Sequence, residues 1–136
     1  MQHHAKSGLF LIEMIISIAF FSVASAACIN LFVSAHLQSV ATRESNMAVM
    51  TAQSAAESFK SANAVPEDIA EILGATVDDD NIVKVFYDSN WSKVDYKSKY
   101  MVEMKIDSTV VPASAVIEVF ESDKSIHSIE VKKYIS

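Results

Sequence analysis

Apolar residues dominate one stretch near the start of the chain. Residues 9–32 form a run of 24 residues (32 − 9 + 1) that contains a single ionisable side chain, Glu13. As a helix this run would be roughly 36 Å long at 1.5 Å per residue, against about 30 Å for the hydrocarbon core of a bilayer. A buried core helix is the alternative, but the rest of the chain is too small to surround such a helix on every side. The run therefore predicts a membrane-spanning helix.

A helical pattern continues beyond residue 32 with a change in character. Apolar and small residues recur three or four positions apart, and neither glycine nor proline occurs between residues 9 and 65. This stripe, once Glu44 is accepted within it, consists of Val33, Leu37, Ala41, Ala48, Ala52, Ala55 and Phe59. We therefore expect one helix of about 50 residues, against a usual length of about 11–12. Its first half is apolar all round, and its amphipathic second half suits packing on a sheet or a neighbouring helix.

Proline and glycine define a second, shorter helix. A residue before proline disfavours the helical region, so the long helix should end at Val65. Pro66 can open a helix over residues 66–73 with acids in its first turn, and Gly74 stands where a C-terminal cap would be. The acidic residues 78–81 do not have the spacing of an EF-hand loop, so they predict a solvated turn rather than a cation site.

The rest of the chain has the pattern of strands. Residues 82–87 are rich in β-branched and aromatic side chains, and residues 100–107 alternate with a period of two. Residues 115–121 and 126–134 flank a polar turn and predict a hairpin. We therefore expect an α+β fold, in which a small antiparallel sheet of three or four strands packs on the second half of the long helix.

Charge and cysteine content narrow the classes of function. The formal net charge is −6 at pH 7, the isoelectric point is near 5.1, and the chain contains no cluster of basic residues. Direct contact of this chain with nucleic acid is therefore not expected. Cys28 is the sole cysteine, which excludes an internal disulfide and a multi-cysteine metal site.

Residues that could support catalysis form no recognisable constellation. The histidines are His3, His4, His36 and His127. Two adjacent histidines in a polar leader are a weak metal signal, and the motifs GxSxG, HExxH, CxxC and a glycine-rich phosphate loop do not occur. We therefore expect no enzyme, no cofactor and no metal site. The aromatic side chains that could form a ligand platform are better explained by core and loop packing; they are Tyr87, Trp91, Tyr96 and Tyr100.

Glu13 is the residue that resists a purely structural explanation. A carboxylate at the centre of a spanning helix costs about 2.5–3.5 kcal/mol on insertion scales, and less near a helix end, where Glu13 lies. The physical remedy is a cation at the same depth. Lys6, seven positions earlier, is one candidate. The other is a free α-amine that cleavage just after Gly8 would create, on this chain or on a neighbour.

The segment from Gly8 to Glu13, Gly-Leu-Phe-Leu-Ile-Glu, resembles the class III signal of type IV pilins and pseudopilins. The resemblance implies that a prepilin peptidase cuts after Gly8 and that the new N-terminal residue, Leu9, is methylated. It also implies that Glu13 pairs with the N-terminal amine of an adjacent subunit. The carboxylate would then be tolerated because its partner arrives when subunits stack.

In outline the resemblance extends to the whole chain and implies a pilin-like fold. The segments would be a leader (1–8), a membrane and filament-core helix (9–32), its amphipathic continuation (33–65) and a head (66–136). Lys6 in the leader favours a cytoplasmic N-terminus, which places the head outside the cytoplasmic membrane. The implied partners are membrane lipid before assembly, other pilin subunits, a prepilin peptidase, and an assembly platform with its ATPase.

Three departures from the family pattern favour a minor pilin or a pseudopilin over an abundant major subunit. Leu9 replaces the commoner phenylalanine or methionine, and Asn30 stands where many major pilins have a helix-bending proline. The C-terminal disulfide loop of many major pilins cannot form. A type IV pilus, a type II secretion pseudopilus and a DNA-uptake pilus all remain open as the system.

Two other interpretations also remain open. Small residues at 24–27 followed by Cys28 could be a signal-peptidase site or an imperfect lipoprotein box, although either would leave Glu13 unexplained. Alternatively, the run could be an uncleaved single-pass anchor for a small extracellular binding domain. Such an anchor should be indifferent to Gly8 and Glu13.

Overall fold

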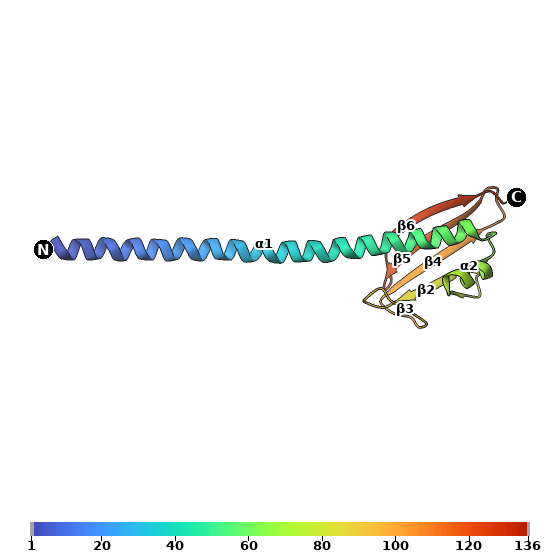
Figure 1. Cartoon of the computed structure of the whole chain (residues 1–136), viewed down its shortest axis with the longest axis horizontal. Helices are drawn as coiled ribbons and strands as arrows, with labels where there is room; N and C mark the ends of the chain where they lie inside the picture. Colours follow the sequence, from blue (N-terminus) through green and yellow to red (C-terminus); the bar gives the residue numbers. More distant parts are fainter. Residues whose placement is uncertain (1, 136) are drawn as a thin grey trace. The chain divides into compact units, whose positions relative to one another are not determined.

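The computed structural model describes residues 2–135, with side chains from residue 5 onward, and divides into two compact units. One unit reaches to Thr42 and the other begins at Arg43, so the long helix contributes to both. The helices are α1 (Gln2–Ser61) and α2 (Pro66–Leu73). The strands are β1 (Thr76–Val77), β2 (Val83–Tyr87), β3 (Lys93–Val94), β4 (Tyr100–Asp107), β5 (Ala113–Glu121) and β6 (Lys124–Lys133) (Figure 1).

The first unit consists of the part of α1 that ends at Thr42, and the apolar side chains of this part are exposed. Phe20, Phe21 and Phe32 are 79%, 74% and 78% exposed, and no residue between Ala5 and Thr42 is buried. α1 contains a window with a mean hydropathy of 2.2, and within the described chain it is the helix long and apolar enough to cross a membrane. So large an exposed apolar surface is typical of a segment that contacts a membrane or another protein.

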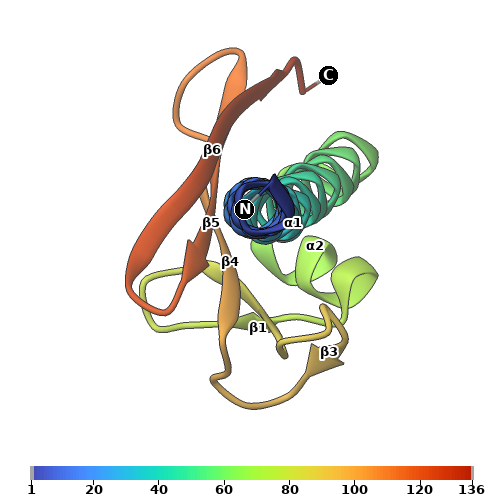
Figure 2. The same ribbon diagram turned by 90° about the vertical axis from the view of Figure 1, so that its left-hand side faces the viewer.

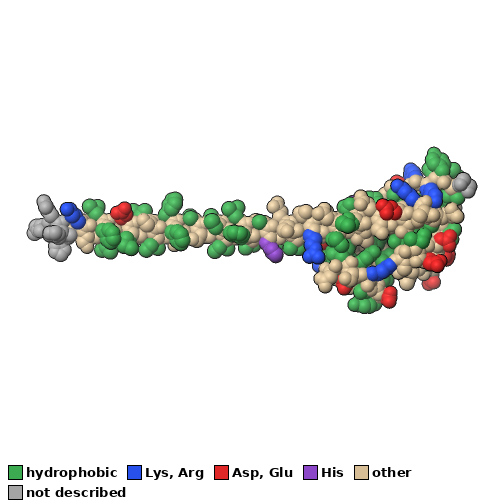
Figure 3. All heavy atoms as spheres, viewed as in Figure 1, with side chains coloured by type: hydrophobic (Ala, Val, Ile, Leu, Met, Phe, Trp, Pro, Cys, Tyr) green, Lys and Arg blue, Asp and Glu red, His purple; other side chains and the backbone are tan. Residues whose placement is uncertain are grey.

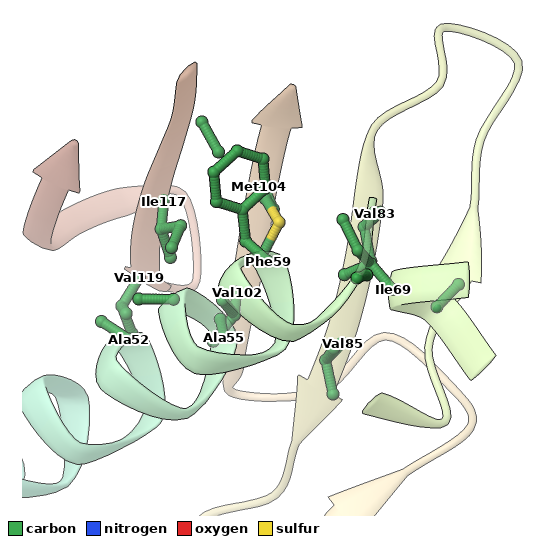
Figure 4. Packing of buried hydrophobic residues seen from close by; sticks show 14 of the residues in the cluster. Ala52, Ala55, Phe59, Ile69, Val83, Val85, Val102, Met104, Ile117 and Val119 are labelled. Atoms are coloured by element: carbon green, nitrogen blue, oxygen red, sulfur yellow. The ribbon is translucent and has the colours of Figure 1, made fainter. Parts of the chain in front are cut away.

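The second unit is built on the amphipathic end of α1. Ala48, Ala52, Ala55 and Phe59 follow one another at spacings of three and four, and each is at most 2% exposed. They belong to one cluster with residues of β2, β4 and β5, whose buried side chains face the helix in Figure 4. Alanine lets the helix approach the sheet closely, and Phe59 fills the remaining volume. This half of the predicted stripe is confirmed as the face that packs on the sheet.

The sheet is antiparallel, and its order is β1-β2-β4-β5-β6; β3 pairs with the last two residues of β2, on the same side as β1. Register places Val85, Val102 and Val119 in one row across three strands, and all three are buried. Figure 2 shows α2 and the last turns of α1 on the same face of this sheet, with β6 at the far edge. The α+β class is confirmed, but the sheet has six strands rather than three or four. The two additional strands, β1 and β3, contain two residues each, too few for an alternating pattern to appear.

Local chemistry explains where the helices end. α1 stops at Ser61, four residues before the expected end (65 − 61), and Ala64 has the non-helical φ of 58°. Pro66 has no N–H to bond the Ala62 carbonyl, which accepts a hydrogen bond from Lys133 Nζ at 2.6 Å instead. α2 matches the predicted bounds, and Gly74 caps it with a φ of 58°. In this left-handed conformation a side chain would be strained, and a Cβ would lie 2.8 Å from Lys93 Nζ.

The acidic loop after β1 forms the turn that the sequence predicts. Asp78 Oδ1 accepts hydrogen bonds from the backbone N–H groups of Asp80 and Ile82, each at 3.0 Å. Its other oxygen lies 2.7 Å from Lys84 Nζ on β2. The hydrogen bond from Lys84, followed by that from the Ile82 N–H, lowers the pKa of Asp78 below its usual value.

Asp78→Asn is expected to destabilise the head in a pH-dependent manner. The Asp78 pKa is lower in the folded chain, so the ionised carboxylate contributes stability above its unfolded pKa of about 3.9. This contribution is lost as the pH falls through the folded pKa. The difference in unfolding free energy between wild type and Asp78→Asn should therefore be largest near neutral pH and shrink below about pH 4.

Denaturant unfolding of the full chain in detergent micelles at several pH values measures this difference. Asp79→Asn is the matched control, because Asp79 is exposed and in none of the ion pairs of the described side chains. A difference that stays constant with pH would contradict the assigned role of the Asp78 charge.

Candidate functional site

The residues of the candidate processing and assembly site lie together near the start of α1. Gly8, Leu9 and Glu13 are all helical. A Cβ added to Gly8 would meet nothing within 4 Å, and the helical conformation does not require glycine there. Glycine in a helix is less favourable than alanine by roughly 0.5–1 kcal/mol. The described fold therefore gives no reason for a glycine at position 8.

Leu9 and Glu13 are four positions apart and share one helix face, separated by about 6 Å along the axis. Leu9 is 68% exposed, and the apolar neighbours Phe10 and Ile12 are 62% and 56% exposed. An amine exposed at Leu9 by cleavage would lie on the same side of the helix as the carboxylate. The site can therefore present a positive and a negative group to neighbouring helices at nearly the same depth.

The Glu13 carboxylate has no ion-pair partner among the side chains of residues 5–135. Lys6, one of the two cations suggested by the sequence, does not pair with it. The other suggested partner, a newly formed chain end, belongs to the processed chain or to a neighbour.

The rival cleavage site lies inside a continuous helix. Residues 24–28 are helical, and Cys28 is exposed among apolar residues that are also exposed, including Ile29 and Leu31. A cut at this point would divide α1 and leave exposed apolar residues at the new terminus.

The other candidate groups are separated in the structure. The side chains of His3 and His4 lie outside the described set, His36 is exposed on α1, and His127 lies on β6 opposite Val119. Among the described side chains, no three histidine, cysteine, aspartate or glutamate residues lie close enough together to hold a metal ion.

A polar network that joins α1 to the sheet was not anticipated from the sequence. The buried Tyr100 hydroxyl, at the start of β4, donates a hydrogen bond to the Glu44 carboxylate. Lys99 Nζ lies 3.7 Å from Glu44 and 3.6 Å from Glu121. Burial is the main cause that raises the pKa of Tyr100, and the hydrogen bond to Glu44 raises it further. The pKa of Lys99 is also raised, mainly by its hydrogen bond with Tyr100. The sequence did contain a signal for this network: Glu44 occupies a position of the apolar stripe, and an acid at such a position needs a polar partner.

Most of the aromatic side chains pack rather than form a platform. Trp91 stacks on Tyr100 with 3.9 Å between ring centroids and 15° between planes, and the Tyr87 ring lies 6.1 Å from Trp91. Tyr96 is 65% exposed and takes no part in this stack. Packing is thus the right interpretation for three of these residues.

Tyr100→Phe is expected to lower the unfolding free energy of the head by about 1 kcal/mol, because it removes a hydrogen bond to a partly exposed carboxylate and little apolar contact. Trp91 is the sole tryptophan and stacks on this ring, so its fluorescence reports the transition during denaturation of the full chain in micelles. Tyr96→Phe is the matched control, and equal stabilities of the two variants would contradict the role assigned to the Tyr100 hydroxyl.

These features define an α+β protein of pilin-like architecture, with a long apolar N-terminal helix packed at its end on an antiparallel sheet. Searches of protein-family models, curated proteins and solved structures give no match to this chain. What the chain does must therefore be inferred from its own residues.

Proposed function

We propose that this chain is a structural subunit, a minor pilin or pseudopilin, of a type IV pilus-like filament. The observation that carries the proposal is Glu13, a carboxylate without an ion-pair partner in residues 5–135, on the exposed apolar part of α1. It lies five positions after a glycine that the fold does not need. A buried core helix or a solvated tail would explain neither residue.

Processing would convert the chain into its assembly form. A prepilin peptidase would cut after Gly8, and Leu9 would become the methylated N-terminus of a mature chain of 128 residues (136 − 8). Loss of Lys6 would take the formal side-chain charge from −6 to −7. Before assembly the helix would rest in the cytoplasmic membrane with the head outside.

Assembly would exchange lipid contact for contact between helices. Because lipid tails are as apolar as the helix surface, burial alone provides little drive between helices in a membrane. Pairing of Glu13 with the amine of an adjacent subunit would supply it, since a charge inside an apolar bundle is tolerated only with a partner. This pairing also favours one register of stacking over the others. An assembly platform with its ATPase would provide the work of extraction from the membrane.

An uncleaved membrane anchor is the second candidate, favoured by the length and hydropathy of α1 alone. It differs from the first in making no use of Gly8 or Glu13. The two candidates therefore predict different N-termini for the working protein.

N-terminal sequencing and intact mass of the protein from its native host test the proposal. A chain that begins at Leu9 and carries one additional methyl group supports the filament subunit. A chain that begins at Met1 supports the anchor, and one that begins at Ala27 or Cys28 supports a secretory or lipoprotein signal. Either of these last results would refute the proposed function.

A further inference from the structure

One exposed surface of the head, the α2 face, combines an apolar side chain with acids. Asp68, Glu71 and Ile72 occupy positions i, i+3 and i+4 of α2 and share one side of the helix. Ile72 is 56% exposed, and the two acids beside it are exposed as well. Residues 66–82 contain six acids and no lysine or arginine. Figure 3 shows acidic side chains gathered along one side of the head.

A second exposed surface, the β6-end patch, is apolar with basic neighbours. Val111 and Tyr134 are 84% and 76% exposed. They lie at the same end of the β5–β6 pair, because Tyr134 follows Lys133, and Lys133 pairs with Ala113, two residues after Val111. Lys132, two residues before Tyr134, is 60% exposed. Among the described side chains its ion-pair partner is Glu130 at 3.5 Å, itself 54% exposed, so the Lys132 charge is available to a partner.

The two surfaces lie toward opposite edges of the sheet. α2 contacts β1 and β2, whereas the β6-end patch adjoins the start of β5 and the end of β6, the last two strands in the order β1-β2-β4-β5-β6. One head can therefore use both surfaces at the same time, toward two different neighbours. A contact that joins different surfaces of identical copies is heterologous, and when the rotation does not close it generates an open helical array.

We propose that the α2 face of one copy of this chain docks on the β6-end patch of the next copy, an inference that rests on the proposed filament function. Ile72 would meet Val111 and Tyr134 at the centre, and Asp68 and Glu71 would meet Lys132 at the rim. This follows the usual arrangement of an apolar centre within a polar rim. Two α2 faces would repel each other through their carboxylates, so the complementary charges select a second copy in head-to-tail orientation.

Cross-linking of the full chain in phospholipid vesicles tests this contact. In a Cys28→Ser background, Ile72→Cys combined with Val111→Cys and a short thiol-reactive cross-linker should give a ladder of multimers. Each single-cysteine chain should give none, and a mixture of the two should give dimers only. Ile72→Cys with Tyr96→Cys is the matched control, since Tyr96 is similarly exposed but lies outside both surfaces. Dimers from Ile72→Cys alone, or a ladder equal to that of the control, would overturn the proposal.

Charge reversal separates specific docking from random collision. Glu71→Lys should reduce the ladder by on the order of tenfold, Lys132→Glu should do the same, and the two together should restore much of it. An unchanged ladder in the single reversals would overturn the pairing, as would adducts to another membrane protein in place of self-adducts when the experiment uses native membranes.

Failure of this contact and failure of the proposed function give different results. A chain that begins at Leu9 in its host but forms no ladder would retain the filament function and lose this interface. A ladder formed by a chain that begins at Met1 in its host would retain the interface and remove the filament function.

Discussion

Replacing Gly8 with leucine is expected to leave the chain at its full 136 residues, with no processed form of 128 (136 − 8). The reason is that recognition by a leader peptidase, as the family resemblance implies, depends on a small residue at the cut. The described fold accepts the change, because a Cβ at position 8 meets nothing within 4 Å and the residue is already helical. Loss of processing would therefore show that the peptidase no longer recognises the cleavage site, and not that the chain has misfolded. Intact mass of the protein from its host measures the result.

Gly8→Ala is the control for this experiment. Alanine is the smallest side chain and improves helix propensity, so some cleavage should persist. Filament incorporation should follow the cleaved fraction in both variants. A Gly8→Leu chain that is still shortened to begin at Leu9 would contradict the role assigned to Gly8. One that enters filaments at its full length would show that assembly does not depend on cleavage.

Glu13→Gln is expected to leave cleavage intact and to lower filament incorporation by on the order of a hundredfold, from a loss of about 3 kcal/mol when a charge is buried without its partner. Under the proposed function, the charge left behind would be the Leu9 amine of the neighbouring subunit. Glutamine has nearly the same size and shape as glutamate, so the packing of the helix is otherwise preserved. The measurement is the ratio of this subunit in sheared filaments to that in membranes.

Glu13→Asp provides the rescue variant, since it keeps the charge on a shorter side chain. Incorporation of Glu13→Asp should lie between that of wild type and that of Glu13→Gln. Incorporation of Glu13→Gln at the wild-type level, with normal processing, would show that Glu13 does not act through its charge.

Elements with complete local signals are predictable from the sequence, and elements that depend on distant residues are not. α2 has the predicted bounds because Pro66 and Gly74 act on their immediate neighbours, and β4 because it alternates without a break. α1 ends earlier than expected, since Pro66 has no N–H to bond the Ala62 carbonyl, and the hydrogen bond that this carbonyl receives comes instead from Lys133 on β6, which the sequence does not indicate. β1 and β3 depend on pairing with β2 and carry no pattern of their own.

The candidate site shows the same division. Glu13 is found by its charge inside an apolar run, and Gly8 and Leu9 by the resemblance of their segment to the pilin signal; all three lie in one short stretch of sequence. The structure adds that Gly8 is sterically free and that Lys6 does not pair with Glu13. Glu44 and Tyr100 lie 56 positions apart, so only the fold brings them together.

The attachment of α1 to the sheet has a mechanical consequence. A filament under tension would pull each head through its helix, and Glu44 is the first residue of the second unit's helix with a described hydrogen bond to the sheet. Tensile force would therefore enter the head at Tyr100 and spread along the contacts from Ala48 to Phe59. These contacts are spread along the helix axis, the direction in which the helix would be pulled. They would therefore share the force and break together rather than one after another.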